Sequence, residues 1–138
     1  MRAVLPLLAV LVAAVAVAAP VPKAVKAKSI EDRIVGKWKM VGGDNGVSSG
    51  FYVVYAKGGA MEFRYEDGGG TARTVYPGKF KTTEPDGENK LGTIDWAVTQ
   101  GGRERGEVSR ILELTEDTLE FVDPQGVKER FERVKEKE

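Results

Sequence analysis

The sequence predicts an all-β protein, an antiparallel up-and-down meander barrel of about eight strands that follows an N-terminal signal peptide. Short runs of alternating apolar and polar residues recur from residue 34 onward. Turn clusters, most of them rich in glycine, separate these runs at intervals of roughly 8–14 residues, and no long helical pattern interrupts them. Consecutive hairpins favour a meander, and about eight strands are enough to close a barrel without exposed edges. A two-sheet sandwich is the alternative.

Composition limits the functions that the chain can have. Its 138 residues are enough for one domain, and 21 basic side chains balance 21 acidic ones, so no overall charge attracts nucleic acid. The chain holds no cysteine and no histidine, which excludes disulfides, thiol nucleophiles, the usual zinc ligands and the commonest general base. We therefore expect a protein that is not an enzyme and that carries no cofactor and no metal.

The first 18 residues have the order of a secretory signal. Arg2 precedes an apolar run over residues 3–17, which ends in the small residues Ala16 and Ala18. We expect cleavage after Ala18 and a secreted or periplasmic protein with no membrane span after cleavage. An uncleaved N-terminal anchor is the alternative, against which Pro6 and the small-residue end argue.

An extended tether and a short helical turn are expected over residues 19–33, before the barrel itself. Residues 20–28 alternate proline, alanine, valine and lysine without a stable apolar period. Ser29 is then placed to cap a helical turn, with Asp32 in the capping-box position. We expect this turn to plug one end of the barrel, which would span residues 34–134 and leave residues 135–138 as a charged tail.

The first strand of the barrel is expected at residues 34–41, where Ile34, Gly36, Trp38 and Met40 share one face. The strand around Pro77 is expected to be kinked or edge-like, because proline cannot donate to a ladder. The further strands are predicted at residues 51–56, 60–66, 71–82, 91–99, 105–115, 118–122 and 127–134.

The order of several short motifs resembles a known family. They are Gly36-Lys37-Trp38 with an arginine near the end of the last strand, Gly92-Thr93-Ile94-Asp95-Trp96, and Ile111-Leu112-Glu113-Leu114 followed by Asp117-Thr118-Leu119. Together they resemble the lipocalin barrels and, more closely, a planctomycete-type group of secreted bacterial lipocalin-like domains of largely unknown function. The resemblance covers residues 34–134.

The resemblance implies structural roles for Gly36, Trp38 and Arg133. Trp38 would lie across the closed end of the barrel and Arg133 would stack on it as a cation–π contact, with Arg130 as the alternative partner. This chain is shorter than typical lipocalins and has no C-terminal helix pattern and no disulfides. A roomy ligand cavity is therefore not implied.

Arg110 is the most informative candidate for a binding residue. It shares the predicted inward face of its strand with Val108 and Leu112, where a charge is costly unless it meets a partner or an anionic ligand. In the functional interpretation Arg110 fixes a carboxylate-bearing ligand whose apolar body is lined by Tyr52, Phe63, Tyr65, Phe80 and Trp96. In the structural interpretation Arg110 reaches a rim or a bulge turns it outward, and the aromatics are packed core.

Other charged residues are assigned to solvated strand faces. Asp95 and Glu113 fall on outward positions, so they are not expected to form an acid/base pair, and Lys128-Glu129-Arg130 alternates in sign as an exposed face does. The sequence thus predicts a non-catalytic, secreted barrel that binds a small apolar or amphipathic ligand. The alternative is a packed barrel that acts as a structural or protein-interaction module of the cell envelope.

Overall fold

The computed structural model describes residues 19–22, 27–46 and 48–137. The predicted signal peptide and part of the predicted tether lie outside the described residues. One short helix and eight strands make up the fold: α1 (Ile30–Ile34), β1 (Gly36–Gly43), β2 (Phe51–Tyr55), β3 (Ala60–Glu66), β4 (Ala72–Thr83), β5 (Thr93–Gln100), β6 (Arg103–Leu114), β7 (Thr118–Val122) and β8 (Lys128–Arg133).

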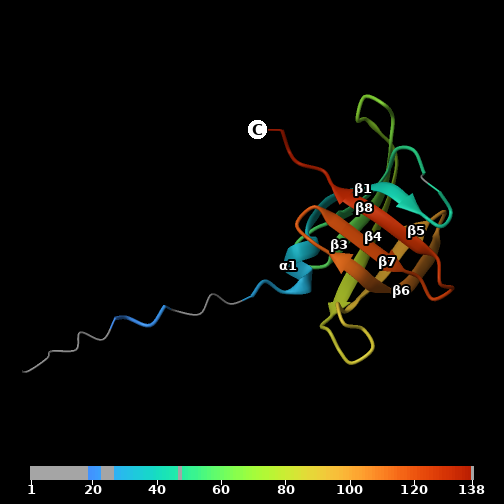
Figure 1. Ribbon diagram of the computed structural model, residues 1–138. Coiled ribbons are helices and arrows are strands. Elements are labelled where there is room, and N and C mark those ends of the chain that lie inside the picture. Colours follow the sequence, from blue (N-terminus) through green and yellow to red (C-terminus); the bar gives the residue numbers. More distant parts are fainter. Residues whose placement is uncertain (1–18, 23–26, 47, 138) are drawn as a thin grey trace, which may run out of the picture.

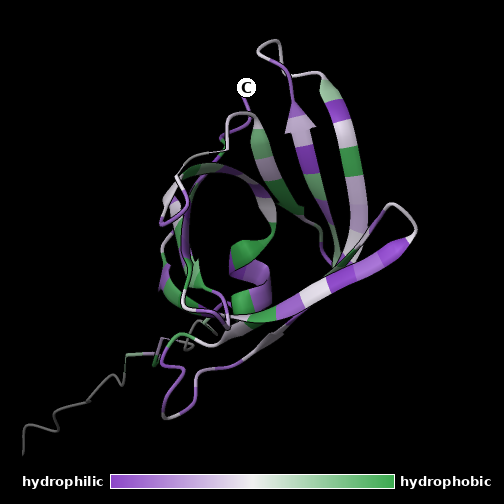
Figure 2. Ribbon diagram, turned by 90° about the vertical axis from the view of Figure 1, so that its right-hand side faces the viewer, coloured by the Kyte–Doolittle hydropathy of each residue, from purple (hydrophilic) through white to green (hydrophobic). Residues whose placement is uncertain are grey.

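The eight strands form a closed antiparallel barrel, as predicted, and not a two-sheet sandwich (Figure 1). Each strand pairs with the next one along the chain, and β1 pairs with β8 to close the ring. Trp38 is opposite Val53 on one side and Arg133 on the other. Figure 2 shows the ring of strands with α1 visible within it. No helix in the described part of the chain is long and apolar enough to cross a membrane.

Helix α1 closes one end of the barrel. Ser29 accepts a hydrogen bond from the Asp32 backbone N–H at 3.1 Å and donates one to the Asp32 carboxylate at 2.9 Å, which is the predicted cap. Ile30 and Ile34 are buried beneath the strands. The prediction that Ile34 begins the first strand is wrong, because Ile34 completes the helix and β1 begins at Gly36.

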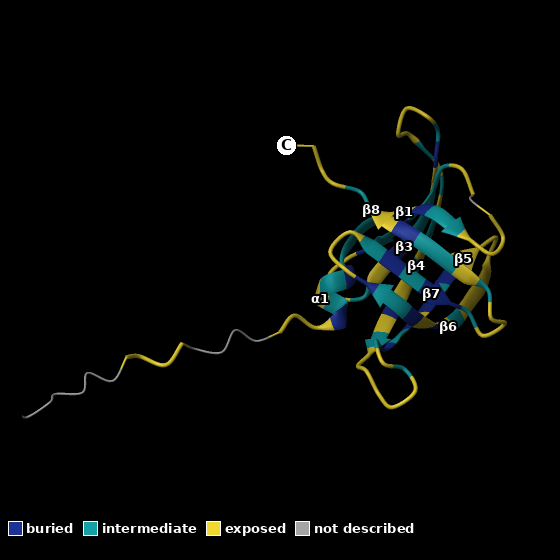
Figure 3. Cartoon of the chain, viewed as in Figure 1, coloured by how far each residue is buried: buried dark blue, intermediate teal, exposed yellow. Residues whose placement is uncertain are grey.

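The core follows from alternation along the strands, with buried positions at every second residue of β1 and β5 (Figure 3). One hydrophobic cluster of buried side chains runs through the barrel. Its members are Ile30, Ile34, Trp38, Met40, Val53, Tyr55, Met61, Phe80, Ile94, Trp96, Val98, Ile111, Leu114, Leu119, Phe121 and Phe131.

Trp38 and Arg133 hold the closed end together. The Arg133 guanidinium lies 4.2 Å from the centroid of the Trp38 ring, which confirms the predicted cation–π contact. The Trp38 indole N–H donates to the Ile34 carbonyl at 2.7 Å. Burial lowers the pKa of Arg133, while Asp117 and Glu116 act in the opposite direction. The same guanidinium donates to three backbone carbonyls, those of Arg33 at 2.5 Å, Glu116 at 2.6 Å and Val35 at 2.7 Å.

Gly36 leaves the space that this contact needs. A Cβ at Gly36 would collide with the Arg133 guanidinium, and the backbone φ of +140° is itself unfavourable for other residues. This accounts for a glycine two residues before the tryptophan. Arg130 is not the partner of Trp38, because it forms ion pairs with Glu113 at 2.9 Å and Glu120 at 3.1 Å instead.

Close approach of neighbouring strands depends on Gly106. It lies opposite Ala97, and a Cβ there would overlap the Trp96 carbonyl oxygen. Proline at position 77 is accommodated because the ladder between β4 and β5 begins only at Gly78. The first half of β4 therefore pairs with β3 alone, as expected for an edge-like segment.

An ion pair packs against the outer side of β1, β2 and β3. A bulge after Tyr65 turns Glu66 so that its side chain is only 3% exposed, and its carboxylate lies 2.7 Å from the Lys37 ammonium. Arg64 approaches the same carboxylate at 3.4 Å. Lys37 also lies over the Tyr52 ring, 4.4 Å from its centroid. Tyr52 thus belongs to this outer cluster.

Candidate functional site

A cavity of about 390 Å³ opens at the end of the barrel opposite Trp38 and α1. We call this end the open end; it is formed by the turns β1–β2, β3–β4, β5–β6 and β7–β8. Twenty residues line the cavity: Met40, Asn45, Gly46, Ser48, Phe51, Val53, Tyr55, Phe63, Tyr65, Tyr76, Trp96, Gln100, Arg105, Glu107, Phe121, Asp123, Gln125, Val127, Glu129 and Phe131.

Aromatic rings of β2, β3 and β5 form one wall of the cavity. The Phe51 ring centroid lies 5.3 Å from that of Phe63 and 5.1 Å from that of Tyr65, and the Phe63 ring meets the edge of Trp96 at 4.9 Å. Such tilted and edge-on pairs are the favourable arrangements for aromatic side chains. Because the rings brace one another, this wall is a rigid apolar surface that is present without a ligand.

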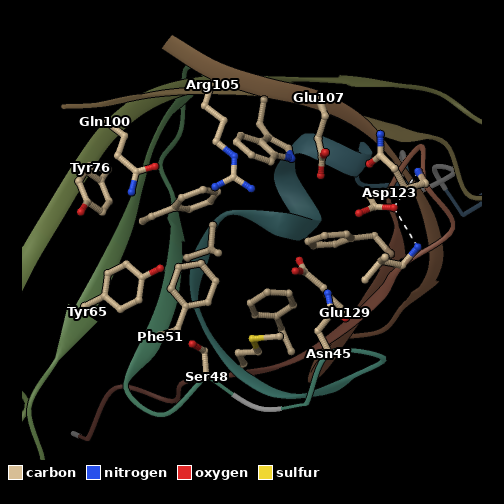
Figure 4. A pocket seen from close by; sticks show the side chains of 18 of the residues that line it. Asn45, Ser48, Phe51, Tyr65, Tyr76, Gln100, Arg105, Glu107, Asp123 and Glu129 are labelled. Atoms are coloured by element: carbon tan, nitrogen blue, oxygen red, sulfur yellow. Dashed lines mark hydrogen bonds between the residues drawn. The ribbon is translucent and has the colours of Figure 1, made fainter. Parts of the chain in front are cut away.

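Charged side chains enter the cavity from β6 and β8. Figure 4 shows Arg105, Glu107 and Glu129 directed into the cavity, with Tyr65 and Tyr76 across from the two glutamates. Arg105 and Glu107 come from the inner face of β6, where Glu107 is the ladder neighbour of Trp96, and Glu129 comes from β8, two residues before the buried Phe131. The cavity is therefore amphipathic, with two carboxylates set among aromatic rings and facing those of β2 and β3.

Burial of these carboxylates disfavours their charged forms. Burial raises the pKa of Glu129 above its ordinary value of 4.5, and the nearby Glu107 and Asp123 raise it further, while Arg105 lowers it. Burial also raises the pKa of Glu107, with Asp123 acting in the same direction, whereas Arg105 and the nearby Ser109 hydroxyl act against it. The fully buried Tyr55 has a pKa raised by burial and by Glu129, so its phenol stays protonated.

Three of the six predicted ligand-binding residues line the cavity. Phe63, Tyr65 and Trp96 form part of the aromatic wall, with Tyr65 being 38% exposed at the open end. Phe80 is buried but packs against Tyr55 at 5.0 Å in the core and does not border the cavity. The placement of Tyr52 inside is wrong, because the inward residues of β2 are its neighbours and Tyr52 lies outside under Lys37.

The prediction that Arg110 faces the interior is also wrong. Arg110 is exposed and Val108 is 51% exposed, whereas Ser109 and Ile111 are buried. The physical reason is an irregularity between Ile111 and Glu113, where the register with β7 shifts by one residue. The outward-facing alternative for Arg110 therefore holds.

The acidic residues of the cavity were missed by the sequence analysis. Glu129 was assigned to a solvated face, yet it is half-buried and points inward. Its position two residues before the apolar Phe131 was the signal available in the sequence. Glu107 gave no such signal, because its apolar neighbour Val108 was assigned to the inward face together with Leu112 and Leu114, and Val108 is in fact exposed.

A second hollow, of about 490 Å³, lies at the closed end and is bordered by Lys28, Asp32, Arg33, Val35, Thr115, Glu116 and Arg133. Its two arginines already hold the closed end together: Arg33 donates to the Leu114 carbonyl at 2.5 Å, and Arg133 donates to the carbonyls beside α1. Among the described residues, no three or more carboxylate, cysteine or histidine side chains are grouped so that they could hold a metal ion.

Comparison with known protein families finds no matching family model, and comparison with curated proteins finds no matching sequence. The barrel is similar to the crystal structure of a lipocalin-like protein from Bacteroides uniformis ATCC 8492, with a TM-score of 0.53 and 12% sequence identity. The similarity covers 74% of this chain and 99% of that chain. At this low identity the likeness shows the fold, which is a lipocalin-like barrel.

Proposed function

We propose that this protein is a secreted, non-catalytic barrel that binds one small amphipathic molecule in the cavity at the open end. The observation that carries the proposal is the cavity of about 390 Å³ with its braced aromatic wall. Cavities of a few hundred cubic ångströms that combine apolar walls with converging polar groups are typical binding sites for small molecules. A lipocalin-like barrel with one end closed by Trp38 and α1 fits this use.

A packed structural or interaction module of the cell envelope is the competing function. Such a module would fill its interior with side chains, as a barrel of about eight strands can do. Buried side chains fill the interior from the closed end, where Trp38 and Ile34 are fully buried, up to Phe131, which borders the cavity. The space at the open end favours ligand binding.

The non-catalytic part of the proposal rests on side-chain chemistry. The chain offers no histidine or cysteine, and Asp95 and Glu113 lie on the outer face, where Asp95 is exposed and Glu113 pairs with Arg130. Export rests on the signal-like residues 1–18, and the likeness to the planctomycete-type group rests on the motifs around Trp38 and Trp96. The non-catalytic role, the export and the likeness to this group are all parts of the proposal.

Uptake of a neutral apolar dye tests the binding function. Nile red is titrated into the purified protein, and we expect saturable binding of one dye per chain with a rise in dye fluorescence. Tyr65→Ala should weaken this binding about three- to tenfold, because it removes one ring of the aromatic wall at an exposed position that the fold tolerates. Native mass spectrometry of the purified protein would detect a ligand that copurifies.

Tyr52→Ala is the matched control, since it removes the same side chain from the neighbouring strand but on the outer face. It should leave the dye affinity unchanged. Absence of saturable dye uptake together with a ligand-free mass would overturn the proposal, and so would equal effects of the two tyrosine substitutions.

A further inference from the structure

The charge balance inside the cavity is strongly one-sided. Of the lining residues, Arg105 is basic and Glu107, Asp123 and Glu129 are acidic, one positive against three negative groups. Asp123 is committed to the β7–β8 turn, where it accepts hydrogen bonds from the backbone N–H groups of Gln125 at 2.9 Å and Val127 at 2.8 Å. The two remaining carboxylates, Glu107 and Glu129, have no such structural task.

Neither Glu107 nor Glu129 forms an ion pair within 4 Å in the described part of the chain, and neither does Arg105. Both glutamates are nevertheless half-buried inside the barrel. A carboxylate that is taken out of water without a partner destabilises the folded state. Two such carboxylates in one cavity are therefore not explained by the stability of the barrel.

Ser109 lies behind Glu107 on the same face of β6. It is the next inward-facing residue after Glu107 and is 0% exposed, and it does not border the cavity. Its hydroxyl is near enough to Glu107 to lower the pKa of that carboxyl, against the effect of burial. The charged form of Glu107 therefore has local support, although no cation among the described residues forms an ion pair with it.

We propose that the ligand of this cavity carries a protonated amine that binds between Glu107 and Glu129 and an apolar body that packs against Phe51, Phe63 and Trp96. This inference rests on the ligand-binding function proposed above and names the class of ligand. A protonated amine has several N–H donors and a positive charge, which match two carboxylates. Phe51 and Phe63 receive the apolar part from across the cavity, and Trp96, the ladder neighbour of Glu107, adds an aromatic ring beside the amine site, where aromatic rings attract a cation.

An anionic ligand held by Arg105 is the opposite outcome. Arg105 is exposed, so water solvates its guanidinium without help from a ligand. A carboxylate ligand would meet one guanidinium and three carboxylates, and like charges in a partly buried site repel strongly. The geometry therefore disfavours the carboxylate ligand that Arg110 was expected to bind.

Three probes with one apolar body and different head groups test the inference: naphthylethylamine, naphthylethanol and naphthylpropionate. Their affinities for the purified protein are measured at neutral pH by displacement of Nile red and by calorimetry. We expect the amine to bind about tenfold more tightly than the alcohol, and the acid to bind more weakly than the alcohol.

Single substitutions locate the preference. Glu129→Gln and Glu107→Gln should each weaken binding of the amine about tenfold while leaving the neutral alcohol within about twofold. Glu132→Gln is the matched control, because Glu132 lies on the same strand as Glu129 but is exposed on the outer face. It should change none of the three affinities.

The outcomes separate this inference from the proposed function. If the alcohol binds but the amine has no advantage, or if Glu129→Gln and Glu107→Gln leave that advantage intact, the amine assignment is wrong and the binding function stands. Tighter binding of the acid would likewise overturn it. If neither Nile red nor any naphthyl probe binds, both proposals fail.

Discussion

Truncation of Trp38 to alanine should destabilise the barrel by about 3–5 kcal/mol, the usual cost of deleting a large buried aromatic side chain. The upper half of this range is expected, because Trp38 is 0% exposed and loses two polar contacts besides its packing. These are the hydrogen bond from its indole N–H to the Ile34 carbonyl and the contact with the Arg133 guanidinium. Since domains of this size are stable by about 5–15 kcal/mol, the variant should fold but only marginally.

Urea unfolding measures this loss through Trp96, the other of the two tryptophans in the sequence. Trp96 is buried, so its fluorescence reports the folded barrel in the variant as well. With a urea dependence of about 1.5–2 kcal/mol per molar, the midpoint should fall by about 2–3 M. Trp38→Phe is the control: it keeps an aromatic ring and loses the indole donor, and should cost about 1–2 kcal/mol. A loss below about 1 kcal/mol for Trp38→Ala would refute the role of Trp38 in closing the barrel.

Three further predictions concern the strands around the barrel. Gly106→Ala should lower the free energy of unfolding by about 1–3 kcal/mol, because its Cβ would overlap a carbonyl oxygen of β5. Gly87→Ala is the control, since Gly87 lies in open space, and should change this free energy by less than about 0.5 kcal/mol. Equal effects of the two substitutions would contradict the steric reason. Lys37→Met should lower the free energy of unfolding by about 1–2 kcal/mol, because the buried Glu66 carboxylate loses its nearest partner. Thermal unfolding measures this loss, and an unchanged melting temperature would contradict the prediction. Glu129→Gln should raise the melting temperature at neutral pH. The folded-state pKa of Glu129 is raised above 4.5, so the native protein binds its proton more tightly than the unfolded chain, and the carboxylate becomes destabilising as pH rises from about 4.5 through the raised pKa. The advantage of the glutamine should vanish below pH 4, and an advantage that persisted there would contradict the cause.

The sequence was most informative in strands where apolar residues alternate with charged ones, because only one face of such a strand can be buried. In β1 the apolar residues Trp38 and Met40 alternate with Lys37 and Lys39, so the buried face was unambiguous. The regular turns between strands were enough to predict eight of them and their meander order. The partnership of Trp38 with Arg133 came from a family resemblance, because no local pattern joins residues on the first and last strands of the barrel.

The predicted site failed where alternation was broken or absent. In β6 the inward face was assigned from Val108, Leu112 and Leu114, although the bulge near Leu112 exchanges the two faces and Val108 is an exposed apolar residue. In β2 both faces are apolar, so nothing in the sequence distinguished Phe51, which lines the cavity, from Tyr52, which does not. A shift of one residue is enough to move a whole set of side chains to the other side of a strand.

The acidic wall could not be found by searching for apolar alternation. That search assigns charged residues to the outside, which is correct for Glu132 and wrong for Glu129 on the same strand. Interior charges are recognisable only when the register of a strand is fixed independently, as the buried Phe131 does for Glu129. A binding cavity is where such exceptions to the pattern are expected.

Buried polar groups have hydrogen-bond partners at the closed end of the barrel, whereas the carboxylates at the open end have no ionic partner in the described part of the chain. This difference is the best argument that the open end serves a function. At the closed end the buried polar groups are satisfied, since Trp38 and Arg133 direct their N–H groups to backbone carbonyls. At the open end two half-buried carboxylates have no ion-pair partner among the described residues, and burial raises their pKa values. Replacing these carboxylates should stabilise the fold, and the recurrent cost of stabilising substitutions at a functional site is lost function. If Glu107→Gln and Glu129→Gln stabilise the protein and at the same time abolish its preference for an amine, the two carboxylates serve ligand recognition.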